Sequence, residues 1–346
     1  MNTQGPALRQ GQGRPERSRR TAEAKRHIFS HIFRIAVAAG LTAYLLWRSH
    51  PADVLQAVAG ADPTWILLAV ALVLADRALM AYRWIALLCT VDRARRPPLG
   101  SLLRIFFVST FVGTFLPASV GGDAVRAFSL ARQNVGGGDA VASVFMDRIL
   151  GVASLLVMAL FGLMLVRGAA ATAPILWALA AAGGLCLATM LLIFSRRTAI
   201  LAAHYTERMP FEKVKGIGRR VLESIRKYSA YPRELVLVLV ASVAVQLLRI
   251  VQAYYLGRGL GITAPLTIYL VYVPLILLVM LLPVTFNGIG TSQAAFVWSF
   301  GQAGVAAPAA FALSVLFVAL GVVGNLPGGL LYAVGEQAPD ADRVRS

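Results

Sequence analysis

Apolar residues lie along this chain in long, nearly uninterrupted runs. Several runs approach or reach the ~20 residues that a helix needs to cross the hydrocarbon core of a bilayer. They extend over residues 28–47, 65–88, 102–116, 149–166, 174–194, 235–256, 266–282 and 308–334. This pattern predicts the fold class, an all-α polytopic integral membrane protein.

Two further apolar stretches, 117–130 and 283–300, each follow a leucine and begin with a proline. In both, a hydroxyl side chain comes two residues after the proline and glycines come next. Interrupted apolar segments in corresponding positions of two halves are typical of transporters built from inverted repeats. We interpret both as re-entrant helical hairpins. The alternative is a pair of full helices kinked by proline and glycine.

The distribution of Lys and Arg predicts the orientation. The segment 195–233 is rich in basic residues and is predicted to be cytosolic, whereas the loops 50–64 and 301–307 carry neither Lys nor Arg and are predicted to be external. With these assignments, 102–131 enters and leaves the membrane on the cytosolic side, and 266–301 does so on the external side. The prediction is about six full spans plus two re-entrant hairpins in an inverted-repeat arrangement.

The same reading divides the chain into three parts. Residues 1–27 are predicted to be a disordered, basic cytosolic arm, 28–335 a single transmembrane domain, and 336–346 a cytosolic tail. Helically spaced apolar residues in the connector at about 195–233 favour an amphipathic helix on the anionic inner leaflet. A solvated connecting helix is the alternative. The predicted location is a bacterial-type plasma (inner) membrane, with both termini cytosolic.

Composition agrees with this picture and excludes several functions. Hydrophobic residues make up 58% of the chain and charged residues 14%, whereas a soluble domain carries about 25% charged residues. The formal net charge of +17 accompanies no nucleic-acid-binding motif. The cysteines and histidines form no metal-ligand pattern, and neither a P-loop nor a nucleophile elbow occurs. No cofactor, metal, catalytic residue or nucleic-acid partner is predicted.

Charged residues inside the apolar runs are the candidates for function, because each costs at least ~2.5–3.5 kcal/mol at the centre of a membrane helix. They are Asp76, Arg77, Arg83, Asp123, Arg126, Asp147, Arg148 and Arg249. A helix that starts at Gly121-Gly122 would present free N–H groups beside Arg126, which is the chemistry of a phosphate site. The alternative is that Asp123 and Arg126 form a pair that only stabilises the hairpin. The predicted headgroup-binding residues are Gly121, Gly122, Asp123, Arg126, Arg148, Arg83, Arg249, Asn287, Gly288, Gly290 and Gln293.

Four motifs carry a resemblance to a known family. They are Arg83-Trp84, Leu-Pro-Ala-Ser-Val-Gly-Gly-Asp-Ala-Val-Arg (116–126), Ala-Ser-Val-Phe-Met-Asp-Arg-Ile-Leu-Gly (142–151) and the segment 282–296. Together they resemble the lysylphosphatidylglycerol synthase transmembrane family of flippase-like proteins, which includes the membrane half of the multiple peptide resistance factor. The resemblance covers about 28–334 and implies a domain that moves lipids between leaflets.

The chain also departs from that family pattern. Asp147 stands where the family often has Glu, and Thr291-Ser292-Gln293 stands where it typically has Val-Arg-Glu, which removes a charge pair at the second tip. No soluble aminoacyl-transferase region follows Val334 in this sequence. The expectation is therefore that this chain does not itself synthesise lysylphosphatidylglycerol.

The predicted function is a non-enzymatic lipid translocase. It would move the headgroup of an anionic or aminoacylated phospholipid, or of a polyprenyl-phosphate-linked lipid, between leaflets. One alternative is a polytopic lipid-modifying transferase using Asp123 or Asp147 as acid or base, and another is an accessory subunit of an envelope-lipid synthesis complex. The expected partners are the lipid substrate and anionic inner-leaflet lipids. Homo-oligomerisation and an envelope-synthesis partner stay open.

Overall fold

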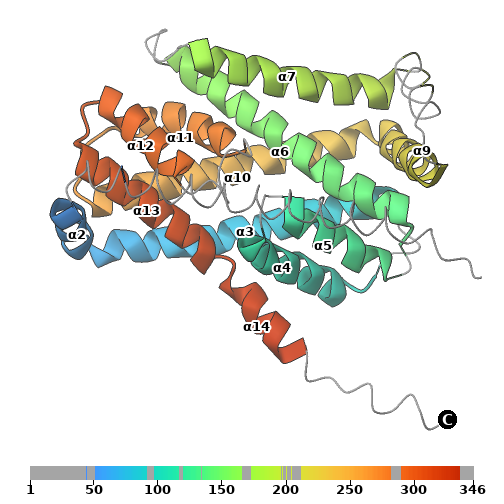
Figure 1. Cartoon of the computed structure of the whole chain (residues 1–346), viewed down its shortest axis with the longest axis horizontal. Helices are drawn as coiled ribbons and strands as arrows, with labels where there is room; N and C mark the ends of the chain where they lie inside the picture. Colours follow the sequence, from blue (N-terminus) through green and yellow to red (C-terminus); the bar gives the residue numbers. More distant parts are fainter. Residues whose placement is uncertain are drawn as a thin grey trace, which may run out of the picture.

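The computed structural model describes residues 44, 51–91, 97–116, 120–133, 135–165, 173–195, 197, 200, 204, 212–281 and 290–335. Every regular element in this part of the chain is a helix (Figure 1). Four helices in it are long and apolar enough to cross a membrane: α3 (Pro63–Val91), α6 (Gly137–Leu165), α10 (Pro232–Gly259) and the segment Ala307–Val334. The prediction of a helical membrane protein is confirmed.

The centre of the molecule is built on α3 and α10, which run antiparallel beside each other (Figure 1). Asp62 lies just before α3, and its backbone N–H donates a hydrogen bond of 2.9 Å to the carbonyl of Gly259 at the end of α10. Helix α6 packs against both helices. Helix α11 (Leu266–Met280) lies against α10 at Gly257, where a Cβ atom would collide with the phenol of Tyr269. Glycine is therefore required for this approach.

Several helices are too short to cross the bilayer alone, and four of them pack as two pairs. These four are α4 (Leu99–Phe115), α5 (Val120–Ala131), α11 and α12 (Thr291–Gln302). At ~1.5 Å per residue, none of them reaches the ~30 Å of a hydrocarbon core. Helices α4 and α5 pack through glycines: a Cβ atom on Gly113 would lie 2.8 Å from the Cα atom of Gly122. The connections at 117–119 and 282–289 lie outside the described residues.

The remaining helices flank this arrangement. Helix α2 (Pro51–Ala59) lies in a stretch predicted to be a loop, and α7 (Ala173–Phe194) packs on α6. The connector contains α9 (Glu212–Lys227), followed by a short 3-10 turn, η1 (Tyr228–Ala230). Helix α9 packs on the start of α6, where Lys227 Nζ lies 2.7 Å from Asp139 Oδ1. A helix in the connector is thus present, and its relation to a membrane surface stays a prediction.

Two predicted spans differ from the observed helices. Helix α6 begins at Gly137 rather than at residue 149, so Asp147 and Arg148 lie well inside the helix instead of at its start. The last apolar run consists of two helices, α13 (Ala307–Val323) and α14 (Leu326–Gly335), separated by a turn at Gly324-Asn325. The predicted arm 1–27, the tail 336–346 and the first span apart from Tyr44 lie outside the described residues.

Candidate functional site

A buried carboxylate on α6 joins two arginines from other helices. Asp147 is only 4% exposed. One of its oxygens, Oδ1, lies 2.7 Å from Arg83 Nη2 and accepts a hydrogen bond from Arg83 Nε at 2.9 Å. The other, Oδ2, lies 3.7 Å from Arg126 Nη1. Asp147 therefore links α3, α5 and α6 at one point.

Arg126 is held on several sides. Its Nε donates a hydrogen bond to Ser109 Oγ, and its Nη2 donates one to Thr110 Oγ1, each with a donor–acceptor distance of 3.2 Å. The guanidinium lies over the rings of Phe106 and Trp84, at 4.5 and 5.3 Å from their centroids. The close approach of α4 and α5 at the glycines brings Arg126 to these groups. Its orientation is thus fixed by the hairpin-like pair of helices and not by one partner.

Asp123 pairs with Arg148 rather than with Arg126. Arg148 Nη2 donates to Asp123 Oδ1 at 2.9 Å, and Arg148 Nε donates to Asp123 Oδ2 at 2.5 Å. This bidentate geometry is typical of strong guanidinium–carboxylate pairs. The hypothesis of a purely local Asp123–Arg126 pair is not what the structure shows. The side chain of Arg148 is 46% exposed, so this pair faces an open space.

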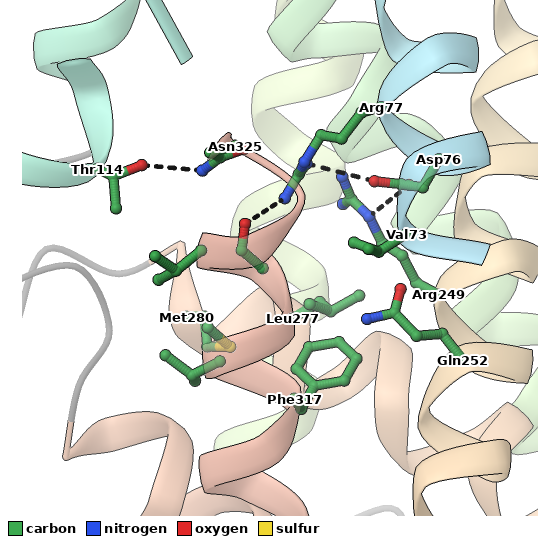
Figure 2. A pocket seen from close by; sticks show the side chains of 13 residues that line it. Val73, Asp76, Arg77, Thr114, Arg249, Gln252, Leu277, Met280, Phe317 and Asn325 are labelled. Atoms are coloured by element: carbon green, nitrogen blue, oxygen red, sulfur yellow. Dashed lines mark hydrogen bonds and ion pairs between the residues drawn. The ribbon is translucent and has the colours of Figure 1, made fainter. Parts of the chain in front are cut away.

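A second carboxylate, Asp76 on α3, lies between two arginines (Figure 2). Asp76 Oδ1 accepts from Arg249 Nε on α10 at 3.1 Å, and Asp76 Oδ2 lies 3.3 Å from Arg77 Nη1. Arg249 therefore faces the interior of the helix bundle. Because Asp76 is 1% exposed, its charge is compensated by these arginines and not by water.

The turn between α13 and α14 supplies two neutral contacts to this group. The Asn325 N–H donates to Val322 O instead of to Gly321 O, and Gly321 O accepts from Arg77 Nη2 at 3.3 Å. The Asn325 side chain donates through Nδ2 to Thr114 Oγ1 on α4 at 2.8 Å (Figure 2). At this helix break, the Gly321 carbonyl and the Asn325 side-chain amide therefore form hydrogen bonds with side chains of α3 and α4.

Several of these side chains line two neighbouring cavities, which we call the two lobes. The lobes have volumes of about 250 and 240 Å³ and share Arg77, Thr114, Arg249 and Asn325. The first lobe is partly apolar and is also lined by Val73, Asp76, Gln252, Leu277, Met280, Phe317, Val318, Gly321 and Val322. The second is more polar and is also lined by Met80, Ser109, Thr110, Gly113, Gly122, Asp123, Arg126 and Arg148.

Positive charge exceeds negative charge in this group. We define the arginine cluster as five arginines and three aspartates that pair with one another, most of which line the lobes: Arg77, Arg83, Arg126, Arg148, Arg249, Asp76, Asp123 and Asp147. Its formal charge is therefore +2. An uncompensated charge of this size at low dielectric favours an anionic ligand.

Several predicted site residues are brought together here. Arg83, Arg126, Arg148, Arg249 and Asp123 belong to the arginine cluster, and Gly122 lines the second lobe. Gly121 instead packs against the Leu116 side chain. The sequence reasoning did not identify Ser109, Thr110, Thr114 and Asn325. The positions 110 and 114 lie one helical turn apart beside the predicted tip, which was the available signal.

The described residues of the second predicted tip, Gly290 and Gln293, lie at the start of α12 and not in the lining of the lobes. Gln293 Oε1 accepts from the Gly290 N–H at 2.6 Å and from Ser292 Oγ at 2.9 Å, so it caps the start of α12. Gly290 has φ +89°, a conformation that favours glycine. Neither Gly290 nor Gln293 lines either lobe. Asn287 and Gly288 lie outside the described residues.

One known protein family matches this chain over most of its length. The model described as "Lysylphosphatidylglycerol synthase TM region" covers residues 31–328. The chain belongs to this family. All residues that line the two lobes, from Val73 to Asn325, fall inside the matched segment. The arginine cluster is thus a feature of the lysylphosphatidylglycerol synthase TM region in this chain, a membrane domain related to lipids. No curated protein and no solved structure matches the chain.

Proposed function

We propose that the protein is a membrane lipid translocase that moves a phosphate-containing headgroup between leaflets. The observation that carries this proposal is the two-lobed cavity, lined by four arginines, between helices that are otherwise apolar. A phosphate crossing a bilayer loses its hydration, and guanidinium groups replace water with charge-assisted hydrogen bonds. The acyl or polyprenyl tails would stay in the surrounding lipid while the headgroup passes through the cavity.

The arrangement of the short helices supports a transporter of inverted-repeat type. Helices α4 and α5 form one pair of short helices, and α11 and α12 form another, with each pair preceded and followed by longer helices. We propose that each pair enters and leaves the membrane on one side, and that the two pairs come from opposite sides. Irregular backbone at membrane depth requires burial in protein or a wet cavity, and the second lobe lies beside the α4–α5 pair.

The ion pairs of Asp123 and Asp147 favour a transport function over a lipid-modifying reaction. A transferase would need Asp123 or Asp147 as a general acid or base. Both are held by arginines, Asp123 by Arg148 and Asp147 by Arg83 and Arg126. In both carboxylates, guanidinium nitrogens lie against the oxygen atoms. Because these ion pairs engage both candidate carboxylates, we propose a non-enzymatic role for this domain.

The proposal is tested by measuring the sidedness of lipids in vesicles. The full chain is reconstituted in liposomes that contain phosphatidylglycerol or phosphatidic acid labelled on one acyl chain with a fluorophore, and an impermeant quencher is added outside. A translocase makes the inner-leaflet pool accessible while the lipid masses stay unchanged. Arg249→Gln should slow exchange about tenfold or more, because it removes one charge-assisted contact.

The matched control is Arg104→Gln, which changes an exposed arginine of α4 that does not line the cavity. This variant should exchange lipids at the unmodified rate. A new lipid mass in the vesicles would indicate a transferase. Absence of exchange for every lipid tested, with the protein folded, would contradict the translocase and leave the accessory-subunit hypothesis.

A further inference from the structure

We infer that the site selects a headgroup with at least two negative charges, a phosphomonoester or a diphosphate, over a phosphodiester or an aminoacylated phospholipid. The inference names the substrate class of the translocase proposed above and rests on that proposal for the transport step. The selectivity itself is a property of the cavity and is tested by binding.

The first argument is charge balance. Counted over the described residues, the arginine cluster has a formal charge of +2. A phosphodiester headgroup neutralises one of these charges and leaves the other in a medium of low dielectric. A dianionic phosphate neutralises both. A lysyl ester adds positive charge to a site that already has an excess of it.

The second argument concerns the carboxylates, which are the groups that would bind an ammonium. Asp76 and Asp147 are each shared by two arginines and are almost fully buried. Asp123 accepts two hydrogen bonds from Arg148, one on each oxygen. An aminoacyl group would have to displace a guanidinium from one of them. Among the described residues that line the lobes, Asp76 and Asp123 are the carboxylates present, so no acidic subsite is left for an amine.

The third argument is the supply of donors. Arg77 and Arg249 line both lobes, and Arg126 and Arg148 line the second. The guanidinium groups of these arginines present several N–H donors to the lobes, and a terminal phosphate offers them three acceptor oxygens. A phosphodiester presents only two non-bridging oxygens.

The test compares lipids that differ in headgroup charge. The full chain in phosphatidylcholine nanodiscs is titrated at pH 8.5 with phosphatidic acid, farnesyl diphosphate, phosphatidylglycerol and lysyl-phosphatidylglycerol, and occupancy is read by native mass spectrometry. This pH lies above the second pKa of a phosphomonoester, about 6 in a phosphorylated side chain. Phosphatidic acid and farnesyl diphosphate should bind about tenfold more tightly than the other two, a difference of about 1.4 kcal/mol.

Three variants separate charge from single contacts. Asp123→Asn raises the cluster charge to +3 and should strengthen the preference, while Arg148→Gln lowers it to +1 and should weaken it. The double variant Asp123→Asn/Arg148→Gln has the original charge without this ion pair and should keep the preference. Arg104→Gln is the control for a lost surface charge. Loss of the preference in the double variant would overturn charge balance as its cause.

Two further outcomes would overturn the inference. One is phosphatidylglycerol or lysyl-phosphatidylglycerol binding as tightly as phosphatidic acid. The other is inorganic pyrophosphate blocking the site at the same concentration as farnesyl diphosphate, which would make the ligand a free anion and not a lipid. Failure of the translocase is distinguishable from both, since it appears as selective binding without any exchange of lipid between leaflets.

Discussion

At the residue scale, the site is organised by carboxylates that are shared between arginines. Asp147 contacts Arg83 and Arg126, and Asp76 contacts Arg77 and Arg249, so each carboxylate orients two guanidinium groups from different positions in the sequence. Such a bridge holds like charges together that would otherwise repel each other. The three aspartates therefore position the arginines, which we propose as the groups that bind a ligand.

The bridges predict unequal effects on stability. Asp147→Asn leaves two buried arginines without their carboxylate and should lower the free energy of unfolding by ~3–5 kcal/mol, the cost of breaking a buried pair from one side. Asp123→Asn should cost about 1 kcal/mol or less, because its partner Arg148 is 46% exposed and solvent screens the pair. Thermal unfolding in detergent measures both. Equal shifts in midpoint would show that Asp147 is not the central bridge.

At the element scale, glycine contacts fix the distance between α4 and α5. A Cβ atom on Gly122 would lie 2.9 Å from Ser109 O and 3.0 Å from Gly113 Cα, both of them backbone atoms that cannot rotate away. This contact places Ser109 and Thr110 within reach of Arg126. The glycines that suggested a phosphate-binding helix start thus also serve helix packing, and the cavity depends on that packing.

Gly122→Val should separate α4 from α5 and remove the hydrogen bonds of Arg126 to Ser109 and Thr110. The expected loss of stability is ~1–3 kcal/mol, typical of overpacking, together with loss of phosphatidic acid binding. Gly184→Ala on α7 is the control, since its Cβ atom would meet nothing within 4 Å and alanine favours a helix by ~0.5–1 kcal/mol. Unchanged lipid binding in folded Gly122→Val would contradict this account of the cavity.

The sequence predicted the positions of the helices better than the ion-pair partners of their charged residues. Apolar runs located α3, α10, α11 and most of α6 because hydrophobicity is a local property of the chain. They missed the start of α6 at Gly137, where packing on α9 extends the helix beyond its apolar part. Charged residues at membrane depth were recognisable by their cost. That Asp123 pairs with Arg148, and Asp76 with Arg249, depends on tertiary packing that periodicity does not specify.

At the scale of the whole molecule, the two ends of the bundle differ in charge. One end carries the basic side chains of α9 and the start of α10: Arg219, Arg220, Arg226, Lys227 and Arg233. At the other end, α2, the α12–α13 turn and the end of α10 meet around Val54, Phe311 and Leu260 (Figure 1). There the described stretches 51–63 and 302–307 contain no Lys or Arg, and the last turn of α10 carries one basic residue, Arg258. The positive-inside rule predicts that the basic end faces the cytosol.

This assignment predicts which exposed positions an impermeant thiol reagent reaches in intact cells. In a background with Cys89→Ser and Cys186→Ala, Gln302→Cys at the end of α12 should be labelled without permeabilisation, whereas Gln133→Cys between α5 and α6 should be labelled only after it. Both positions are exposed, so accessibility to water is matched. Labelling of both from the outside would place the α5–α6 turn and the α12–α13 turn on one face. That result would rule out the opposed entry of the two short-helix pairs, because each pair is followed by one of these turns.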